Sequence, residues 1–170
     1  KEPLIPIGHE IACDQFRLPI ESPKKAFKTS GPKLTVSTNG DNLSASSSKV
    51  NFMFNKKTGI VTSYKVDGTE YFSEGFGIQP NFWRAPTDND YGNGMPKRLQ
   101  VWKESSKNFN VTDATVTMDG NNAVVNVNYL LPAGNLYIVN YTIYPSGAVN
   151  VAARFTSTDM DAAQTEVSES

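Results

Sequence analysis

Apolar and polar residues alternate along most of the chain from Lys33 onward, which is the pattern of half-buried β-strands. Phe52 and Phe54 fall on one face of such a segment, and asparagine and methionine side chains occupy the other face. The expected strands cover residues 34–38, 43–47, 50–55, 60–66, 69–75, 108–118, 123–131, 136–145 and 148–157. This pattern predicts an antiparallel β-sandwich of about nine or ten short strands.

Turn residues separate the expected strands at short intervals. Asn39-Gly40 and Asp67-Gly68 are strong signals for tight hairpins, because these residue types tolerate a positive φ. Further turn signals occupy residues 119–122, 132–135 and 145–147. The strands should therefore follow one another as a series of hairpins.

The N-terminal 32 residues differ from the rest of the chain in their hydrophobic pattern and proline content. Residues 8–18 alternate in the manner of a single strand. Residues 19–32 contain three prolines and read as a linker. We therefore expect the sandwich to begin at about Lys33, after an isolated strand and a linker.

One short helix is expected over residues 96–105. Pro96 suits a first helical position, and Leu99 and Trp102 share a face because they are three residues apart. A helix of about two turns is marginal alone, so it should dock on the sandwich through Trp102.

Composition and charge exclude several classes of function. The chain has 170 residues, 38% of them hydrophobic and 19% charged, with a net charge of −1. These values suit a folded domain and give no basic surface for nucleic acid. The sequence has no apolar run of about 18 residues that would suggest a membrane-spanning helix. Zinc is poorly supported, because the only histidine and cysteine, His9 and Cys13, lie far in sequence from Asp88 and Asp90, and no metal site is assigned, although a loose site for a hard cation at those two aspartates is left open.

The least ordinary stretch is NFWRAPTDNDYGNG, residues 81–94. If it were extended, Asp88 and Asp90 would share a side and could act as acid and base, although turn and capping hydrogen bonds are the commoner reason for such a pair. Trp83 could stack on a sugar while Arg84, Asp88, Asn89 and Asp90 bind its hydroxyls. Alternatively, the aromatic side chains belong to the core, and Arg84 forms a salt bridge with one of the two aspartates.

The run from Arg84 to Asp90 resembles the signature of the small-chain, C-terminal domain of glycoside hydrolase family 2 β-galactosidases, in which Arg-Ala-Pro-x-Asp-Asn-Asp follows an aromatic strand. Trp102, in the expected helix, also fits this pattern. Upstream, Gly8, His9, Gln15 and Leu18 resemble the last strand of the immunoglobulin-like domain that precedes the small chain in that family.

The resemblance implies a fold for this chain and a place for it in a larger enzyme. Residues 33–170 would form the N-terminal half of a galactose-mutarotase-like supersandwich. Residues 1–18 would be the last strand of the immunoglobulin-like domain, and residues 19–32 the linker. The parent enzyme would hydrolyse terminal β-D-galactosides with retention, using two glutamates of a separate (β/α)₈ barrel domain.

The resemblance also implies what this chain would lack. It would carry no catalytic residue and no cofactor of its own, and the Mg and Na ions of the parent would sit in the barrel. Its partner would be the catalytic barrel of the same parent, with a galactoside ligand and homo-oligomer formation left open. The compartment stays open between bacterial cytoplasm and periplasm. The rival interpretation is an autonomous carbohydrate-binding module.

Overall fold

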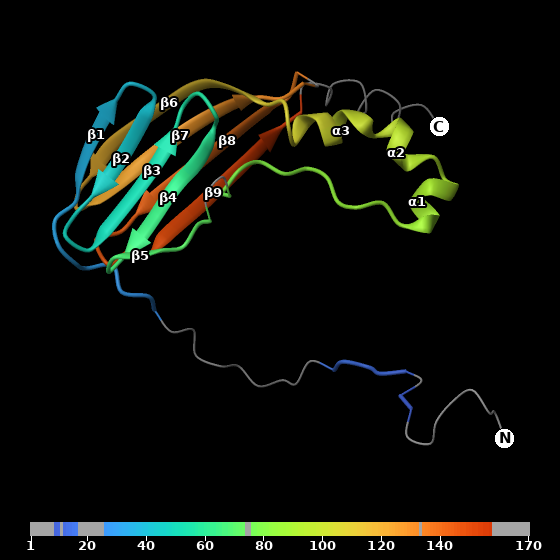
Figure 1. The fold of residues 1–170 in the computed structure, drawn as a ribbon, viewed down its shortest axis with the longest axis horizontal. Helices are drawn as coiled ribbons and strands as arrows, with labels where there is room; N and C mark the ends of the chain where they lie inside the picture. The colour runs from blue at the N-terminus through green and yellow to red at the C-terminus, as the bar shows by residue number, and fades with distance from the viewer. Residues whose placement is uncertain (1–8, 11, 17–25, 74–75, 133, 158–170) are drawn as a thin grey trace, which may run out of the picture.

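The computed structural model describes residues 9–10, 12–16, 26–73, 76–132 and 134–157. Two antiparallel sheets pack face to face, and a short helical excursion projects from one end of them (Figure 1). The expected all-β sandwich is therefore confirmed. No helix in the described part of the chain is long and apolar enough to cross a membrane.

Sheet A has five strands in chain order: β1 (Thr35–Asn39), β2 (Asn42–Ser46), β3 (Val50–Asn55), β4 (Ile60–Val66) and β5 (Thr69–Glu70). Sheet B has four strands, also in chain order: β6 (Asn110–Asp119), β7 (Asn122–Leu130), β8 (Leu136–Ile143) and β9 (Val149–Thr156). Each sheet is a continuous series of hairpins, as the turn signals predict. Gly40, Gly68 and Gly120 have positive φ angles in three of these turns.

The core lies between the two inner faces. Phe52 and Phe54 point into it with 1% and 0% of their surface exposed, while the residues beside them on β3 are half-buried. On sheet B, β7 and β8 contribute the facing side chains. These include Val125, Tyr129 and Tyr141, each at most 1% exposed. Burying each such side chain stabilises the fold by about 1.5–3 kcal/mol relative to leaving it exposed.

Two tyrosine hydroxyls tie the sheets together across this core. The Tyr129 hydroxyl donates a hydrogen bond to the Gly59 carbonyl at 2.9 Å, and the Tyr64 hydroxyl donates to the Gly147 carbonyl. Gly59 has φ of +70°, and a Cβ there would lie 2.7 Å from the Phe109 ring. Glycine is thus required at residue 59, both for the turn and for close packing.

The expected strand at residues 69–75 is shorter in the structure. Strand β5 contains only Thr69 and Glu70. The Glu70 carboxylate accepts hydrogen bonds from the Ser63 hydroxyl at 2.5 Å and from the Tyr64 amide at 2.9 Å. It also accepts from the Phe72 amide at 3.2 Å, which takes up a donor that a longer strand would use. The edge of sheet A therefore ends early.

The helical region also differs from the expectation. The single helix expected at residues 96–105 is two helices, α2 (Met95–Arg98) and α3 (Gln100–Ser105), separated at Leu99. A further helix, α1 (Asp88–Gly92), occupies a stretch for which we expected a loop and no helix. The described residues among 9–16 are exposed and belong to no helix or strand. A strand of a preceding domain therefore stays a prediction.

Candidate functional site

The signature stretch lies on a helical arm, residues 81–106, that connects the two sheets and carries α1, α2 and α3 (Figure 1). Helix α3 lies against the sandwich, and α1 lies at the far end of the arm. The Phe82 amide donates a hydrogen bond to the Ser106 hydroxyl at 2.7 Å. This bond holds together the two ends of the arm where they meet the sheets.

Aromatic side chains anchor the arm. The ring of Phe82 meets the Tyr137 ring edge-on, with centroids 5.1 Å apart, and lies 6.2 Å from the Trp102 ring. Trp102 lies 5.7 Å from Phe155 near the end of β9. Aromatic pairs at these separations add about 0.5–1.5 kcal/mol each beyond the area that they bury. Docking of the arm through Trp102 is therefore confirmed.

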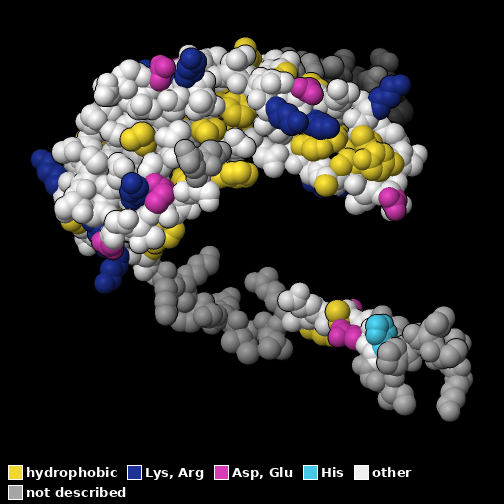
Figure 2. Space-filling model, viewed as in Figure 1, with side chains coloured by type: hydrophobic (Ala, Val, Ile, Leu, Met, Phe, Trp, Pro, Cys, Tyr) yellow, Lys and Arg dark blue, Asp and Glu magenta, His cyan; other side chains and the backbone are white. Residues whose placement is uncertain are grey.

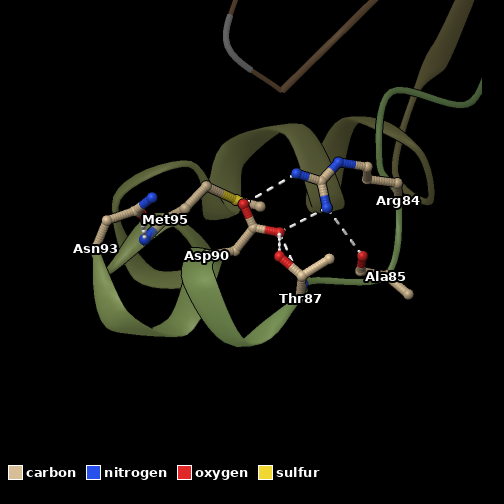
Figure 3. A network of polar contacts seen from close by, with 6 residues as sticks. All are labelled: Arg84, Ala85, Thr87, Asp90, Asn93 and Met95. Carbon is tan, nitrogen blue, oxygen red and sulfur yellow. Dashed lines mark hydrogen bonds and ion pairs between the residues drawn. The ribbon is translucent and has the colours of Figure 1, made fainter. Parts of the chain in front are cut away.

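A salt bridge closes the loop that leads into α1. The Arg84 guanidinium donates from Nη1 to Asp90 Oδ2 at 2.6 Å and from Nη2 to Asp90 Oδ1 at 2.9 Å (Figure 3). Nη1 also donates to the Ala85 carbonyl at 3.1 Å. Such a two-pronged pair fixes orientation as well as distance. We call Arg84, Thr87 and Asp90 the clamp.

Thr87 completes the clamp as the residue before α1. Its backbone amide donates to Asp90 Oδ2 at 2.7 Å and its hydroxyl donates to the same oxygen at 2.9 Å. The third helical residue thus reaches back to the helix start, as in a capping box. Hydrogen bonds from Arg84, together with those from Thr87, hold the pKa of the Asp90 carboxyl well below its usual range. The pKa of Arg84 is raised in turn, chiefly by its hydrogen bonds to Asp90.

The two aspartates of the signature have separate environments. In a helix, residues two apart do not face each other, so Asp88 and Asp90 do not share the side that an extended segment would give them. The alternative of capping hydrogen bonds is confirmed for Asp90. Asp90 is buried, with 8% of its surface exposed. Asp88 is exposed, and its side chain makes no hydrogen bond or ion pair within the described part of the chain. Asn89 is exposed as well. The salt bridge between Arg84 and one of the aspartates is confirmed, and its partner is Asp90.

Sequence reasoning missed Thr87, although a signal for it was present. A threonine followed three residues later by a side chain that can accept from its amide is the local pattern of a helix start. Asn93 is a second polar side chain that sequence reasoning missed at a helix start. Its side chain accepts from the Met95 amide at 2.9 Å, just before α2 (Figure 3).

Trp83 lies between two hollows of the arm. One, of about 500 Å³, is lined by Trp83 with amide, hydroxyl and lysine side chains, including Asn81 and Lys103. The other, of about 230 Å³, is lined mainly by Phe82, Met95, Leu99 and Trp102, with Arg84 beside them. A sugar contact by Trp83, Arg84, Asp88, Asn89 or Asp90 stays a prediction. Among the described residues, no group of three or more His, Cys, Asp or Glu side chains is placed to hold a metal ion.

The chain is similar to several β-galactosidases. It is 34% identical to the "Beta-galactosidase" of Priestia megaterium over 85% of its own length and 14% of that protein. It is 30% identical to the enzyme of Kluyveromyces lactis, again over 14% of that protein. It is 27% identical to the "Beta-galactosidase small subunit" of Latilactobacillus sakei, over 61% of this chain and 39% of that subunit. The chain thus spans a minor part of the length of each of these relatives.

The matched region includes the whole arm and most of both sheets. A family model described as "Beta galactosidase small chain" matches residues 46–167, which is more than half of the chain. The clamp and its aromatic anchors all lie inside this region. The chain therefore belongs to the β-galactosidase small-chain family.

Proposed function

We propose that this chain is a non-catalytic, supporting part of a β-galactosidase that hydrolyses terminal β-D-galactosides with retention. The observation that carries the proposal is the small-chain match, which runs through both sheets and the arm. The chain corresponds to 14% of two long relatives, so most of each enzyme lies outside the matched part. A catalytic domain elsewhere in such an enzyme would be the partner of this chain.

The chemistry of the clamp favours a structural role over a catalytic one. Retaining glycosidases use one carboxyl as a nucleophile and another as a proton donor, about 5–5.5 Å apart. Asp90 suits neither role, because the guanidinium and Thr87 occupy both of its oxygens. Its lowered pKa keeps it ionised, so it has no proton to donate near neutral pH. The clamp instead holds the arm in one shape.

The arm offers a surface for the catalytic partner. Leu99 and Val101 expose 37% and 38% of their surface, and Tyr91 exposes 65%. Hydrophobic side chains gather on the side of the arm seen in Figure 2, with Lys and Arg side chains beside them. A rigid apolar patch with a charged margin is typical of a protein–protein interface. We propose that the exposed apolar side chains of the arm, among them Tyr91, Leu99 and Val101, pack against the catalytic part of the enzyme.

The first test is an activity assay on the purified chain. We expect no hydrolysis of a chromogenic β-galactoside above the uncatalysed rate. Turnover that co-purifies with the chain and is lost in Asp90→Asn would overturn the non-catalytic assignment.

The second test places Leu99→Glu and Val101→Glu, one at a time, in the longer enzyme. Each should lower activity by about tenfold or more, because a buried unpaired carboxylate weakens an apolar contact. Met118→Glu on β6 is the matched control, since Met118 is also 38% exposed but lies away from the arm. If both arm variants behave like the control, the proposed contact is wrong.

A further inference from the structure

A polar pocket lies at the opposite end of the sandwich from the arm. It has a volume of about 640 Å³, within the range of ordinary ligand sites. Its walls come from residues 29–31 and Lys33, from the β6–β7 turn at 119–122, and from residues 144–145 after β8. Strand β6 begins just after α3 and ends at this turn, so roughly 30 Å of strand separates the pocket from the arm. We call it the hairpin-end pocket.

The charged and amide side chains of this pocket have no hydrogen-bond or ion-pair partners among the described residues. The side chains of Lys33, Asp119, Asn121 and Asn122 line it, and none of them makes a hydrogen bond or ion pair with another described residue. In the clamp, by contrast, every oxygen of Asp90 is taken. The hairpin-end pocket therefore presents free donors and acceptors to whatever enters it.

The pocket also has a fixed wall. The ring of Tyr144 meets the Phe27 ring edge-on with centroids 5.4 Å apart. Gly31 packs so closely on the turn after β8 that a Cβ there would lie 2.1 Å from the Pro145 carbonyl oxygen. Segment 29–33 is thus seated against sheet B, and the pocket is shaped before any ligand binds.

The chemistry of the lining selects a class of ligand. One ammonium, on Lys33, and one carboxylate, on Asp119, balance in charge and are not paired with each other. Two asparagine amides supply both donors and acceptors. The Tyr144 ring adds an apolar surface. A ligand that fits is neutral, has hydroxyls around its edge and has an apolar face, which describes a saccharide ring.

We propose that the hairpin-end pocket binds a neutral saccharide, at a site separate from the signature loop. The amides of Asn121 and Asn122 and the carboxylate of Asp119 bind hydroxyls, and the Tyr144 ring borders the sugar face. This inference does not rest on the proposed function, because it concerns the other end of the molecule and needs no catalytic partner.

The test is an NMR titration of the isotope-labelled chain with lactose. Amide signals of residues 29–33, 119–122 and 144–148 should shift, with a Kd on the order of millimolar. Asn121→Ala should weaken binding by about fivefold or more, through the loss of a hydrogen-bonding side chain. The matched control is Asn39→Ala, an exposed turn asparagine at the far end of sheet A, which should leave the Kd unchanged. Asp119→Asn is a second variant that keeps a good turn residue and removes the charge.

Several results would overturn the proposal. Signals that stay unmoved by lactose, galactose and glucose at about 100 mM, where millimolar binding is saturated, would rule out a saccharide site. Shifts confined to the arm, or an unchanged Kd in both pocket variants, would place the site elsewhere. Shifts with galacturonate or inorganic phosphate but not with lactose would mean that the pocket selects anions.

Discussion

The clamp on the arm and the hairpin-end pocket are built from the same kinds of residue and behave differently. Each combines an aspartate with one cationic side chain and with neutral polar side chains: the clamp has Arg84, Asp90 and Thr87, and the pocket has Lys33, Asp119 and two asparagines. In the clamp, Arg84 and Thr87 use both oxygens of Asp90, so the polar groups satisfy one another. In the pocket, Lys33 and Asp119 are not paired, and the side chains of Asn121 and Asn122 make no hydrogen bond with another described residue.

This difference separates two roles for polar residues. A closed set of hydrogen bonds stiffens the chain and leaves little to offer a ligand, whereas an open set in a shaped cavity offers its full bonding capacity. The comparison predicts that changes in the clamp alter the order of the arm, and that changes in the pocket alter binding.

Trp102→Ala should have the largest effect, because it removes the ring that joins the arm to Phe82 and Phe155. A fully buried tryptophan costs about 3–5 kcal/mol when truncated, and this half-buried one should cost about 2–3 kcal/mol. Urea unfolding measures the loss, and trypsin should cleave faster at Lys97 and Arg98. Trp83→Ala is the control, since Trp83 is also half-buried but makes no ring contact with another described residue. Equal losses in both variants would contradict the anchoring role of Trp102.

Gly31→Val should disturb the pocket and spare the arm. The new Cβ would meet the Pro145 carbonyl oxygen at 2.1 Å, so segment 29–33 must move away from the turn. Overpacking of this kind costs about 1–3 kcal/mol. Calorimetric melting measures the cost, and the tryptic pattern of the arm should stay unchanged. Gly92→Ala is the control, because a Cβ there has nothing within 4 Å. A Gly31→Val protein as stable as the control would show that the segment is not seated as described.

Asp90→Asn should loosen the arm without unfolding the sandwich. An amide keeps the shape of the carboxylate but loses its charge and one acceptor oxygen, so it cannot receive all the bonds from Arg84 and Thr87. Cleavage by trypsin at Lys97 and Arg98 should become several-fold faster, because local opening admits the protease. Asp88→Asn makes the same charge change two residues away and should cleave at the original rate. Matching rates for the two variants would argue against the clamp.

The sequence predicts the sheets well and the sites poorly, for physical reasons. Alternation and turn residues are local signals, and they place the hairpins of both sheets and the inward faces of Phe52 and Phe54. Helix α1 has poor intrinsic helix formers in the run DNDYG. It exists because Arg84 and Thr87 bond to Asp90, and sequence patterns show such partners only weakly. The pocket needs three segments that are far apart in the chain, and only the completed fold brings them together.

Lowering the pH should have the smallest effect, and it should reduce the difference in arm stability between Asp90→Asn and the unmodified chain. The pKa of Asp90 lies below its usual range in the folded state, so the clamp contributes stability that is fully present above the unfolded value of about 4. That stability disappears as the pH falls from about 4 toward the lowered folded pKa. Hydrogen exchange at the arm amides measures the free energy of local opening. The difference in this free energy between the two proteins should be constant from pH 7 to about 5 and should become smaller below about pH 4. If this difference disappears between pH 7 and 5, the pKa of Asp90 is not lowered, and the hydrogen bonds from Arg84 and Thr87 do not act as described.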